Sequence, residues 1–237
     1  MTREAPYDSF VTNSMPRTRA VAVATDLRRM IQTGELAAGT PLRQDALAER
    51  FGVSITPVRE ALAVLSREGL IRYDVHRGAV VFPPTPDDIR ENFEIRLALE
   101  PLATRLAAPR LDDEDFQDIE DLAGRLREIV DDPETAVASG TYEQLDRAFH
   151  GRIFTAAGRP RLAGMIETLR DASAAYAHLY ATADDPAQLL LALQAQHDQL
   201  LAALRDSDAG RASQVAAEHV WLTGVRHGFE PDGSPPE

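Results

Sequence analysis

One set of side chains in the second half of the sequence is suited to binding a metal ion. It combines imidazoles with a carboxylate on three expected helices: Asp146, His150, His197 and His219. Asp146 and His150 are four residues apart, so both project from one side of a helix expected over residues 137–158. The same side carries the apolar residues Phe149 and Ile153. This pair is therefore predicted to lie beside the interior of a helical bundle.

The two later histidines interrupt stripes of aliphatic residues. In a helix expected over 186–206, the stripe recurs at intervals of three and four residues: Leu190, Leu193, His197, Leu200 and Leu204. His219 has the same kind of position in a helix expected over 208–229, where it follows Ala212 and Val215. Residues at this spacing share one helix face, so both imidazoles are predicted to face inward.

An interior that receives one carboxylate and three imidazoles is costly unless these groups are paired or bind a cation. Such ligands suit a divalent ion, with zinc first and nickel, manganese or iron as alternatives. Two plainer interpretations stay open. Each histidine is a hydrogen-bonded core residue, or Asp146 and His150 form an intrahelical pair.

Arg96 is a second candidate, because it places a cation on the inward side of a helix expected over 87–108. A planar guanidinium suits bidentate binding of an organic acid, so Arg96 is a candidate effector-binding residue. The alternative is an ion pair with Glu100, four residues further along the helix. The residues alone leave both interpretations open.

These candidates belong to a part of the chain that is helical throughout. Helical patterns run at roughly six ranges: 87–108, 112–131, 137–158, 160–182, 186–206 and 208–229. Three prolines in residues 83–86 favour an extended linker before them. We therefore expect an all-helical domain over 87–230, which binds an effector and dimerises, and a disordered tail over 231–237.

The first part of the chain has a different order of elements. Helices are expected over 18–33, 44–50 and 55–68, followed by two β-prone runs that flank residues 74–78: 70–73 and 79–82. This order predicts a winged helix-turn-helix over 18–82, preceded by a flexible arm over 1–17. The expected fold class is thus mainly α. Three helices and a β-hairpin wing precede an all-α bundle of about six helices.

The third of these helices is predicted to enter a major groove of DNA. Ser54 is placed as its N-cap, with a side-chain oxygen that accepts a hydrogen bond from a helical amide. Thr56 and Arg59 fall on its outer face, where they can contact base edges or phosphates. Arg77 and Gly78 at the hairpin tip place a cation against the DNA backbone or minor groove. Alternatively, Arg59 is only a solvated surface residue, but the combination of turn, helix and hairpin favours DNA binding.

Charge is divided unevenly along the chain, whose net charge is −13. Residues 1–84 hold 11 Arg and 9 acidic residues, a net charge of +2. Residues 85–237 hold 14 Arg and 29 acidic residues, a net charge of −15, which repels DNA. There is no cysteine, which excludes disulfides and thiolate metal sites. No apolar run approaches the ~18 residues of a membrane span, and no signal peptide is seen, so we expect a cytoplasmic protein without a membrane partner.

Residues 18–82 closely resemble the N-terminal domain of GntR-family regulators. The resemblance is carried by these segments: Leu47-Ala48-Glu49-Arg50-Phe51-Gly52-Val53-Ser54, Thr56-Pro57-Val58-Arg59-Glu60-Ala61-Leu62, Glu68-Gly69-Leu70 and Gly78. It implies that Pro57 also belongs to the DNA-binding set. Two departures stand out, because the family usually has Arg at Ile55 and often Glu-Arg at Gln44-Asp45. They imply weaker phosphate contacts or an altered operator, with Arg43 compensating for one lost cation.

Residues 87–227 resemble the FCD-type effector domain that defines the FadR subfamily of these regulators. The matching motifs are Arg96-Leu97-Ala98-Leu99-Glu100-Pro101, Asp146…Phe149-His150, Gln196-His197-Asp198 and Glu218-His219-Val220. The resemblance implies a metal ion held by Asp146, His150, His197 and His219. Its remaining coordination positions would take a small carboxylate effector. Arg159 departs from the family, which commonly has Asn at that position.

Together these features predict a homodimeric, ligand-responsive transcription factor, a repressor bound to pseudo-palindromic double-stranded operator DNA. Binding of a small organic acid would shift the linker and the spacing of the two recognition helices, and so change operator affinity. One alternative is a regulator for which the metal ion itself is the signal. Another is a metal-dependent enzyme, against which stand the lack of a general base or nucleophile and the presence of residues 18–82.

Overall fold

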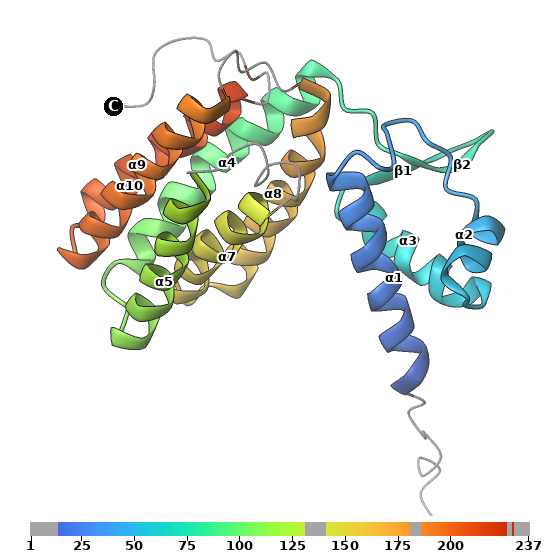
Figure 1. The fold of residues 1–237 in the computed structure, drawn as a ribbon, viewed down its shortest axis with the longest axis horizontal. Coiled ribbons are helices and arrows are strands. Elements are labelled where there is room, and N and C mark those ends of the chain that lie inside the picture. The colour runs from blue at the N-terminus through green and yellow to red at the C-terminus, as the bar shows by residue number, and fades with distance from the viewer. Residues whose placement is uncertain (1–13, 131–140, 181–185, 227–228, 230–237) are drawn as a thin grey trace, which may run out of the picture.

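The computed structural model describes residues 14–130, 141–180, 186–226 and 229. They form two parts that lie side by side, a small N-terminal domain with a two-stranded sheet and a larger helical bundle (Figure 1). Nine helices and two strands are found in these residues. The expected fold class is confirmed.

The N-terminal domain consists of three helices followed by a hairpin. Its elements are α1 (Ser14–Gln32), α2 (Gln44–Phe51), α3 (Ile55–Arg67), β1 (Ile71–Asp74) and β2 (Gly78–Val81). The two strands are antiparallel, with Ile71 opposite Val81 and Asp74 opposite Gly78. Gly52 ends α2 in the left-handed region, at φ 62°, which permits the tight turn into α3. The result is a winged helix-turn-helix.

Helix α1 begins at Ser14, inside the stretch expected as an arm over residues 1–17. Pro16 lies in its first turn, where a missing backbone N–H leaves no helical hydrogen bond unmade. The helix therefore starts four residues before the start expected at residue 18. Residues 1–13 and the expected tail 231–237 lie outside the described residues.

Helix α4 (Pro86–Ala107) begins at the last proline of the expected linker. Thr85 is its N-cap, and the Thr85 hydroxyl accepts a hydrogen bond from the Asp88 amide at 3.2 Å. In return the Thr85 amide donates to Asp88 Oδ2 at 2.7 Å, which completes a capping box. Because Pro86 is well suited to the first helical position, the helix starts one residue earlier than the pattern suggested.

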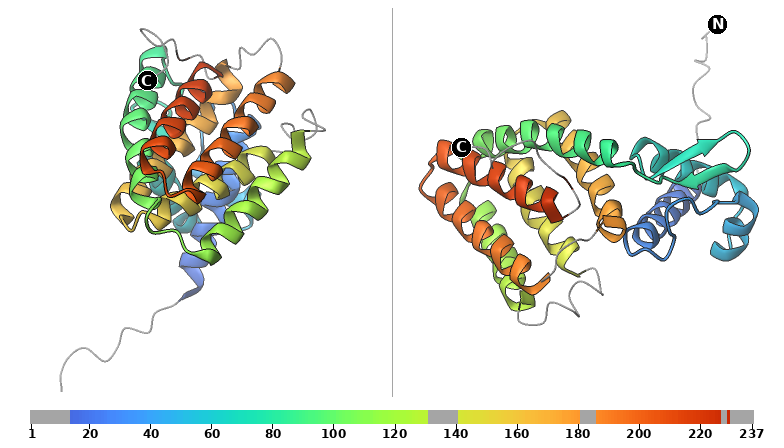
Figure 2. Two further views of the ribbon diagram at one scale, coloured as in Figure 1. Left: turned by 90° about the vertical axis from the view of Figure 1, so that its left-hand side faces the viewer. Right: turned by 90° about the horizontal axis from the view of Figure 1, so that it is seen from above.

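The bundle contains α4 and five further helices: α5 (Asp113–Val130), α7 (Thr141–Ala156), α8 (Pro160–Tyr180), α9 (Pro186–Arg205) and α10 (Ala209–Arg226). Helix α4 packs against α10, α8 and α7, while α5 packs against α7 and α9. Figure 2 shows the helices gathered around a common interior, away from the sheet. The aliphatic stripe expected on α9 is buried, with Leu190, Leu193, Leu200 and Leu204 at most 1% exposed. Within the described ranges, no helix is long and apolar enough to cross a membrane.

The capping box of α4 gives a first prediction. Replacing Thr85 by alanine removes the hydroxyl acceptor, which should lower the free energy of unfolding by about 1 kcal/mol. Chemical denaturation followed by circular dichroism measures this change. Thr85→Ser keeps the acceptor and serves as the control, so equal losses in the two variants would contradict the role of the cap.

Candidate metal centre and DNA-binding face

Three helices bring the four expected metal ligands together in the bundle interior. Asp146 and His150 come from α7, His197 from α9 and His219 from α10. His150 Nε2 lies 3.2 Å from His197 Nε2 and 3.1 Å from His219 Nε2. Asp146 Oδ1 lies 3.5, 3.2 and 4.0 Å from the Nε2 atoms of His150, His197 and His219. One atom from each residue therefore faces a single point.

This donor set fits a divalent metal ion. Tetrahedral ligands about 2.0–2.2 Å from zinc lie about 3.3–3.6 Å from one another, which is close to the separations observed here. The three imidazoles are buried, at 3% exposed or less. The Nδ1 atoms of His197 and His219 have no hydrogen-bond partner among the described residues. Each of these rings is thus able to keep its proton on Nδ1 and present Nε2 to a cation.

Burial also sets the charges of the ligands. It lowers the pKa of His150 to about 4, aided by the positive charge of Arg170. Burial and the neighbouring His150 hold the pKa of His219 well below its ordinary value. Burial alone would raise the pKa of Asp146, but Arg170 and His150 bring it well below its ordinary value. At neutral pH His150 and His219 are therefore neutral and Asp146 is a carboxylate, the forms that bind metal ions.

A chain of buried charges leads from Asp146 to α4. Arg170 Nη2 donates to Asp146 Oδ2 at 2.5 Å, and Arg170 Nη1 donates to Glu100 Oε2 at 3.0 Å. Glu100 Oε1 in turn accepts from Arg96 Nε at 2.6 Å. Arg96 also donates to Ser173 Oγ at 3.0 Å. The two arginines and two carboxylates balance one another, which keeps this charged interior tolerable.

The structure thus places Arg96 inside the bundle. There Arg96 forms an ion pair with Glu100, which is the alternative interpretation that the sequence left open. Burial lowers the Arg96 pKa, while Glu100 opposes that change. The sequence analysis missed Arg170, which contacts the carboxylate ligand directly. A signal was present, because Arg170 lies four residues after the buried Ile166 and three before the buried Ser173. It is a cation on the inward face of its helix, as Arg96 is.

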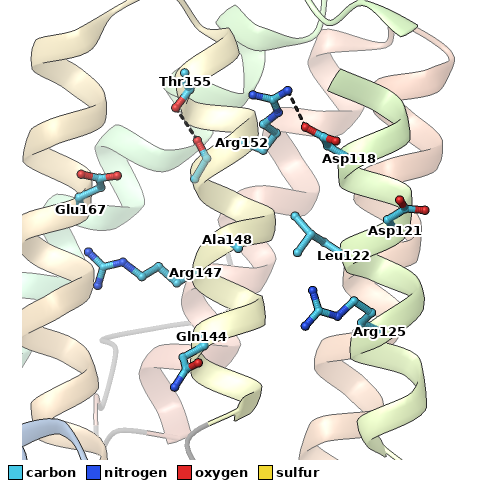
Figure 3. Close-up of a pocket in the computed structure, with 11 residues that line it drawn as sticks. Asp118, Asp121, Leu122, Arg125, Gln144, Arg147, Ala148, Arg152, Thr155 and Glu167 are labelled. Atoms are coloured by element: carbon cyan, nitrogen blue, oxygen red, sulfur yellow. Dashed lines mark hydrogen bonds and ion pairs between the residues drawn. The ribbon is translucent and has the colours of Figure 1, made fainter. Parts of the chain in front are cut away.

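A cavity on the surface of the bundle lies apart from the metal centre. A surface cavity of about 610 Å³ lies between α5, α7 and α8, and none of the four ligands lines it (Figure 3). Its side chains are mostly charged, among them Asp118, Arg125, Arg147 and Arg152. Arg152 Nη2 lies 2.6 Å from Asp118 Oδ2, which joins α7 to α5. The metal centre is therefore separate from this outer surface.

The N-terminal domain presents most of the expected DNA-contacting residues to solvent. Thr56 and Arg59 are exposed on α3, and Arg77 and Gly78 are exposed at the wing. No ion pair or hydrogen bond of the Arg59 side chain is found within the described part of the chain, so its guanidinium is available to DNA. Arg43 is exposed as well, but its Nη2 lies 3.0 Å from Asp45 Oδ2.

The structure differs from the expected hydrogen bond of Ser54 at the start of α3, and it buries Pro57. Ser54 is the N-cap by position, but its side chain makes no capping hydrogen bond. A capping side chain accepts from the second or third helical amide, and the third position is Pro57, which has no N–H. Pro57 is itself buried with Val58 and Ala61, so it cannot contact DNA as the resemblance implied.

Arg159 lies in the turn between α7 and α8 and is exposed. Its Nη1 donates to the carbonyl of Gly158 at 3.1 Å, and Gly158 has a left-handed φ of 63°. This side chain, where the family commonly has Asn, therefore points out of the bundle rather than into the charged interior.

A winged helix-turn-helix joined to a helical bundle with a buried polar centre defines a DNA-binding regulator with a sensory domain. Comparison with known families agrees. Residues 19–81 match the bacterial regulatory proteins of the gntR family, and residues 91–221 match the FCD domain. The chain belongs to the GntR family of transcriptional regulators, in the FadR-type group that carries an FCD domain.

Individual relatives support the same assignment. The HTH-type transcriptional regulator McbR of Escherichia coli is 31% identical, over 83% of this chain and 86% of its own length. The HTH-type transcriptional repressor GlaR, also of Escherichia coli, is 26% identical over 82% of this chain and 89% of its own. The solved structure of E. coli McbR/YncC superposes with a TM-score of 0.74 at 28% identity, covering 86% of this chain and 93% of that one. These relatives are DNA-binding regulators and not enzymes, as expected for this chain.

The contact between Arg170 and Asp146 gives a second prediction. Arg170→Met removes the charge that orients the carboxylate ligand, and should weaken zinc binding about 10–100-fold. Competition with a chromophoric chelator measures the affinity, and circular dichroism checks that the variant is folded. Arg170→Lys, which keeps the charge, should lose less of the zinc affinity.

Arg161→Met provides the matched control, because Arg161 is an exposed residue of the same helix. Its zinc affinity should equal that of the wild type. If Arg170→Met bound zinc as tightly as Arg161→Met, the orienting role of Arg170 would be wrong.

Proposed function

We propose that this protein is a transcriptional repressor whose operator affinity depends on a small carboxylate effector bound beside a divalent metal ion in the helical bundle. The observation that carries the proposal is the set of four ligand atoms within 4.8 Å of one another, below a winged helix-turn-helix. Membership of a family of regulators with an effector-binding FCD domain supports it. The protein would act on DNA in the cytoplasm.

The metal ion would be held by Asp146, His150, His197 and His219, with zinc as the first choice and nickel, manganese or iron as alternatives. When bound, it supplies positive charge that attracts a carboxylate. The chain's own buried charges cancel, since Arg96 and Arg170 balance Glu100 and Asp146. The charge of a bound metal ion would therefore be left unbalanced, and an anion would neutralise it. Arg96 is the side chain we propose for binding the far end of that anion.

On DNA, two copies would bind a pseudo-palindromic operator as a homodimer, because one α3 recognises only a half-site. The contacts would come from Arg43, Thr56, Arg59, Arg77 and Gly78, with the Ser54 hydroxyl placed at the start of the same helix. The bundle carries the acidic part of the sequence, so it would stay clear of the duplex.

Metal content is the direct test of the centre. Elemental analysis of the purified protein should find about one divalent ion per chain. The double variant Asp146→Ala, His150→Ala should lose it, because two of the four ligands are removed. His76→Ala changes an exposed histidine of the wing and should keep the ion. Equal metal in the double variant and the wild type would remove the metal from the proposal.

Operator binding tests the response. A duplex selected by the wild-type protein from a randomised library is titrated with zinc alone and then with zinc plus each of a series of mono-, di- and tricarboxylates. At least one acid should change operator affinity about 5–150-fold, the usual range of coupling between two sites. A full change with zinc alone would identify the ion as the signal. Affinity that no metal or acid alters would contradict the proposal.

A further inference from the structure

The first turn of α3 presents an aliphatic side chain to solvent. Ile55 is the first residue of the helix and is 44% exposed, whereas Val58 and Leu62 on the same helix are fully buried. Ile55, Arg59 and Ala63 follow one another at intervals of four residues, and all three are exposed. Such residues form one line along a helix, so Ile55 lies next to Arg59 on the face that points away from the core.

The base edges in the major groove offer this side chain only one favourable contact. The second helix of a helix-turn-helix contacts base edges through its N-terminal residues, and Ile55 is the first of these. In the major groove, the bases present donors, acceptors and a single apolar group, the C5-methyl group of thymine. An isoleucine cannot hydrogen-bond, so opposite any other base it would desolvate polar groups without replacing their bonds.

We propose that Ile55 is a specificity-determining residue that recognises the methyl group of a thymine in each half-site. It would lie beside the base or phosphate that Arg59 contacts. An arginine at the same position would instead donate to guanine, so this single residue would decide which base is selected there.

Thymine can be replaced by deoxyuridine, which lacks only the C5-methyl group, and this gives a direct test. Duplexes are selected from a randomised library with the full-length wild-type protein at fixed salt. Each thymine of the half-site is then replaced in turn, and the dissociation constant is measured by fluorescence anisotropy. At one position the replacement should weaken wild-type binding about fourfold per half-site, the effect of losing one buried methyl group. For Ile55→Ala the same replacement should have no effect.

Further variants sharpen the result. Ile55→Arg should select guanine at the position where the wild type selects thymine. Met165→Ala removes an exposed apolar side chain from the bundle and should behave as the wild type at every position. Since Ile55 is exposed, its variants should keep the wild-type melting temperature. Equal losses for the wild type and Ile55→Ala at every thymine, or a selected half-site without thymine, would overturn the proposal.

A second, independent observation concerns the contact between the two parts of the molecule. Helix α1 packs against α8, as Figures 1 and 2 show. At this contact Arg28 binds Glu68, which follows α3, with Nη2–Oε1 and Nε–Oε2 distances of 2.6 and 3.0 Å. Arg28 Nε also lies 3.9 Å from Asp171 Oδ2 of α8. Asp171 is 5% exposed and forms an ion pair with Arg147 of α7.

The two bundle residues of this contact are the direct neighbours of the metal centre in sequence. Arg147 follows the ligand Asp146, and Asp171 follows Arg170, which binds that ligand. Adjacent helical residues point about 100° apart, so each helix turns one side chain to the metal centre and the next toward the α1 contact. A rotation of α7 or α8 at the centre therefore moves Arg147 or Asp171 as well.

We propose that Asp171 forms the interdomain contact that orients the DNA-binding domain on the bundle and couples this domain to the metal centre. This proposal rests on the proposed function for its coupling, but the orienting role stands on the contacts alone. Without the Asp171 charge, the ion pairs that Asp171 forms with Arg28 and with Arg147 would both be lost. Phe82, which follows β2, would still pack against the bundle.

Distance measurement between spin labels tests the orienting role without any metal. The chain has no cysteine, so Glu49→Cys on α2 and Glu114→Cys on α5 give two unique and exposed sites. Labelled protein is diluted with unlabelled protein and measured by double electron–electron resonance. Asp171→Asn should broaden the distance distribution relative to the wild type. Glu120→Gln breaks an ion pair between α5 and α9, away from α1, and should leave it unchanged. An unchanged width of the distance distribution in Asp171→Asn would overturn the orienting role of Asp171.

The coupling is tested with zinc and the selected operator duplex. In the presence of zinc, the carboxylate with the largest effect in the titration above should change the operator affinity of the wild type at least about fivefold. In Asp171→Asn this ratio should fall below about twofold, although zinc binds with unchanged stoichiometry. Equal ratios in the two proteins would overturn the coupling. Wild-type operator affinity that neither zinc nor any carboxylate alters would count against the proposed function, whereas the label distances would still decide the orienting role.

Discussion

The packing of the partly buried Asp146 carboxylate against three buried imidazoles is the constraint on which the rest of the bundle depends. A carboxylate taken out of water is costly unless opposite charge and hydrogen bonds replace the lost hydration. Arg170 supplies that charge in the structure, and Arg170 in turn requires Glu100, which requires Arg96. Three helices, α4, α7 and α8, are thereby joined through polar contacts in an otherwise aliphatic interior. A cation at the centre would add to a balanced set of charges and so create the demand for an anion.

Much of this arrangement follows from helical periodicity. His197 and His219 replace aliphatic residues in regular stripes, and Asp146 and His150 are one turn apart, so local sequence already shows which way all four face. Their convergence on one point depends on how α7, α9 and α10 pack, which no local pattern reveals. The family resemblance supplied that step. Arg170 shows the limit of the approach, because an inward arginine is visible in the sequence but its partners lie 24 and 70 residues away.

The DNA-binding domain illustrates how one residue can mislead a local rule. Ser54 is a favoured capping residue at a correct capping position, but the proline three residues later removes an amide that it would cap. Pro57 then serves the core instead of the surface, packed beside Val58. Pro86 shows the opposite case, in which proline begins a helix rather than extending a linker. In each case the position within the first turn decides the outcome, and the residue type alone does not.

We propose that the contact between α7 and α8 is the physical route from sensing to DNA binding. A ligand can shift an equilibrium only through contacts that differ between two states. The Asp146–Arg170 contact is such a candidate, since a metal ion beside Asp146 Oδ1 would change the charge that Arg170 meets at Oδ2 of the same carboxylate. Any readjustment must turn α7 against α8, and the neighbouring Arg147–Asp171 pair lies where Arg28 meets the bundle. Sensing of the ligand and orientation of the DNA-binding domain would then both depend on one helix–helix contact. The short linker after β2 would connect the domains and would not transmit the signal.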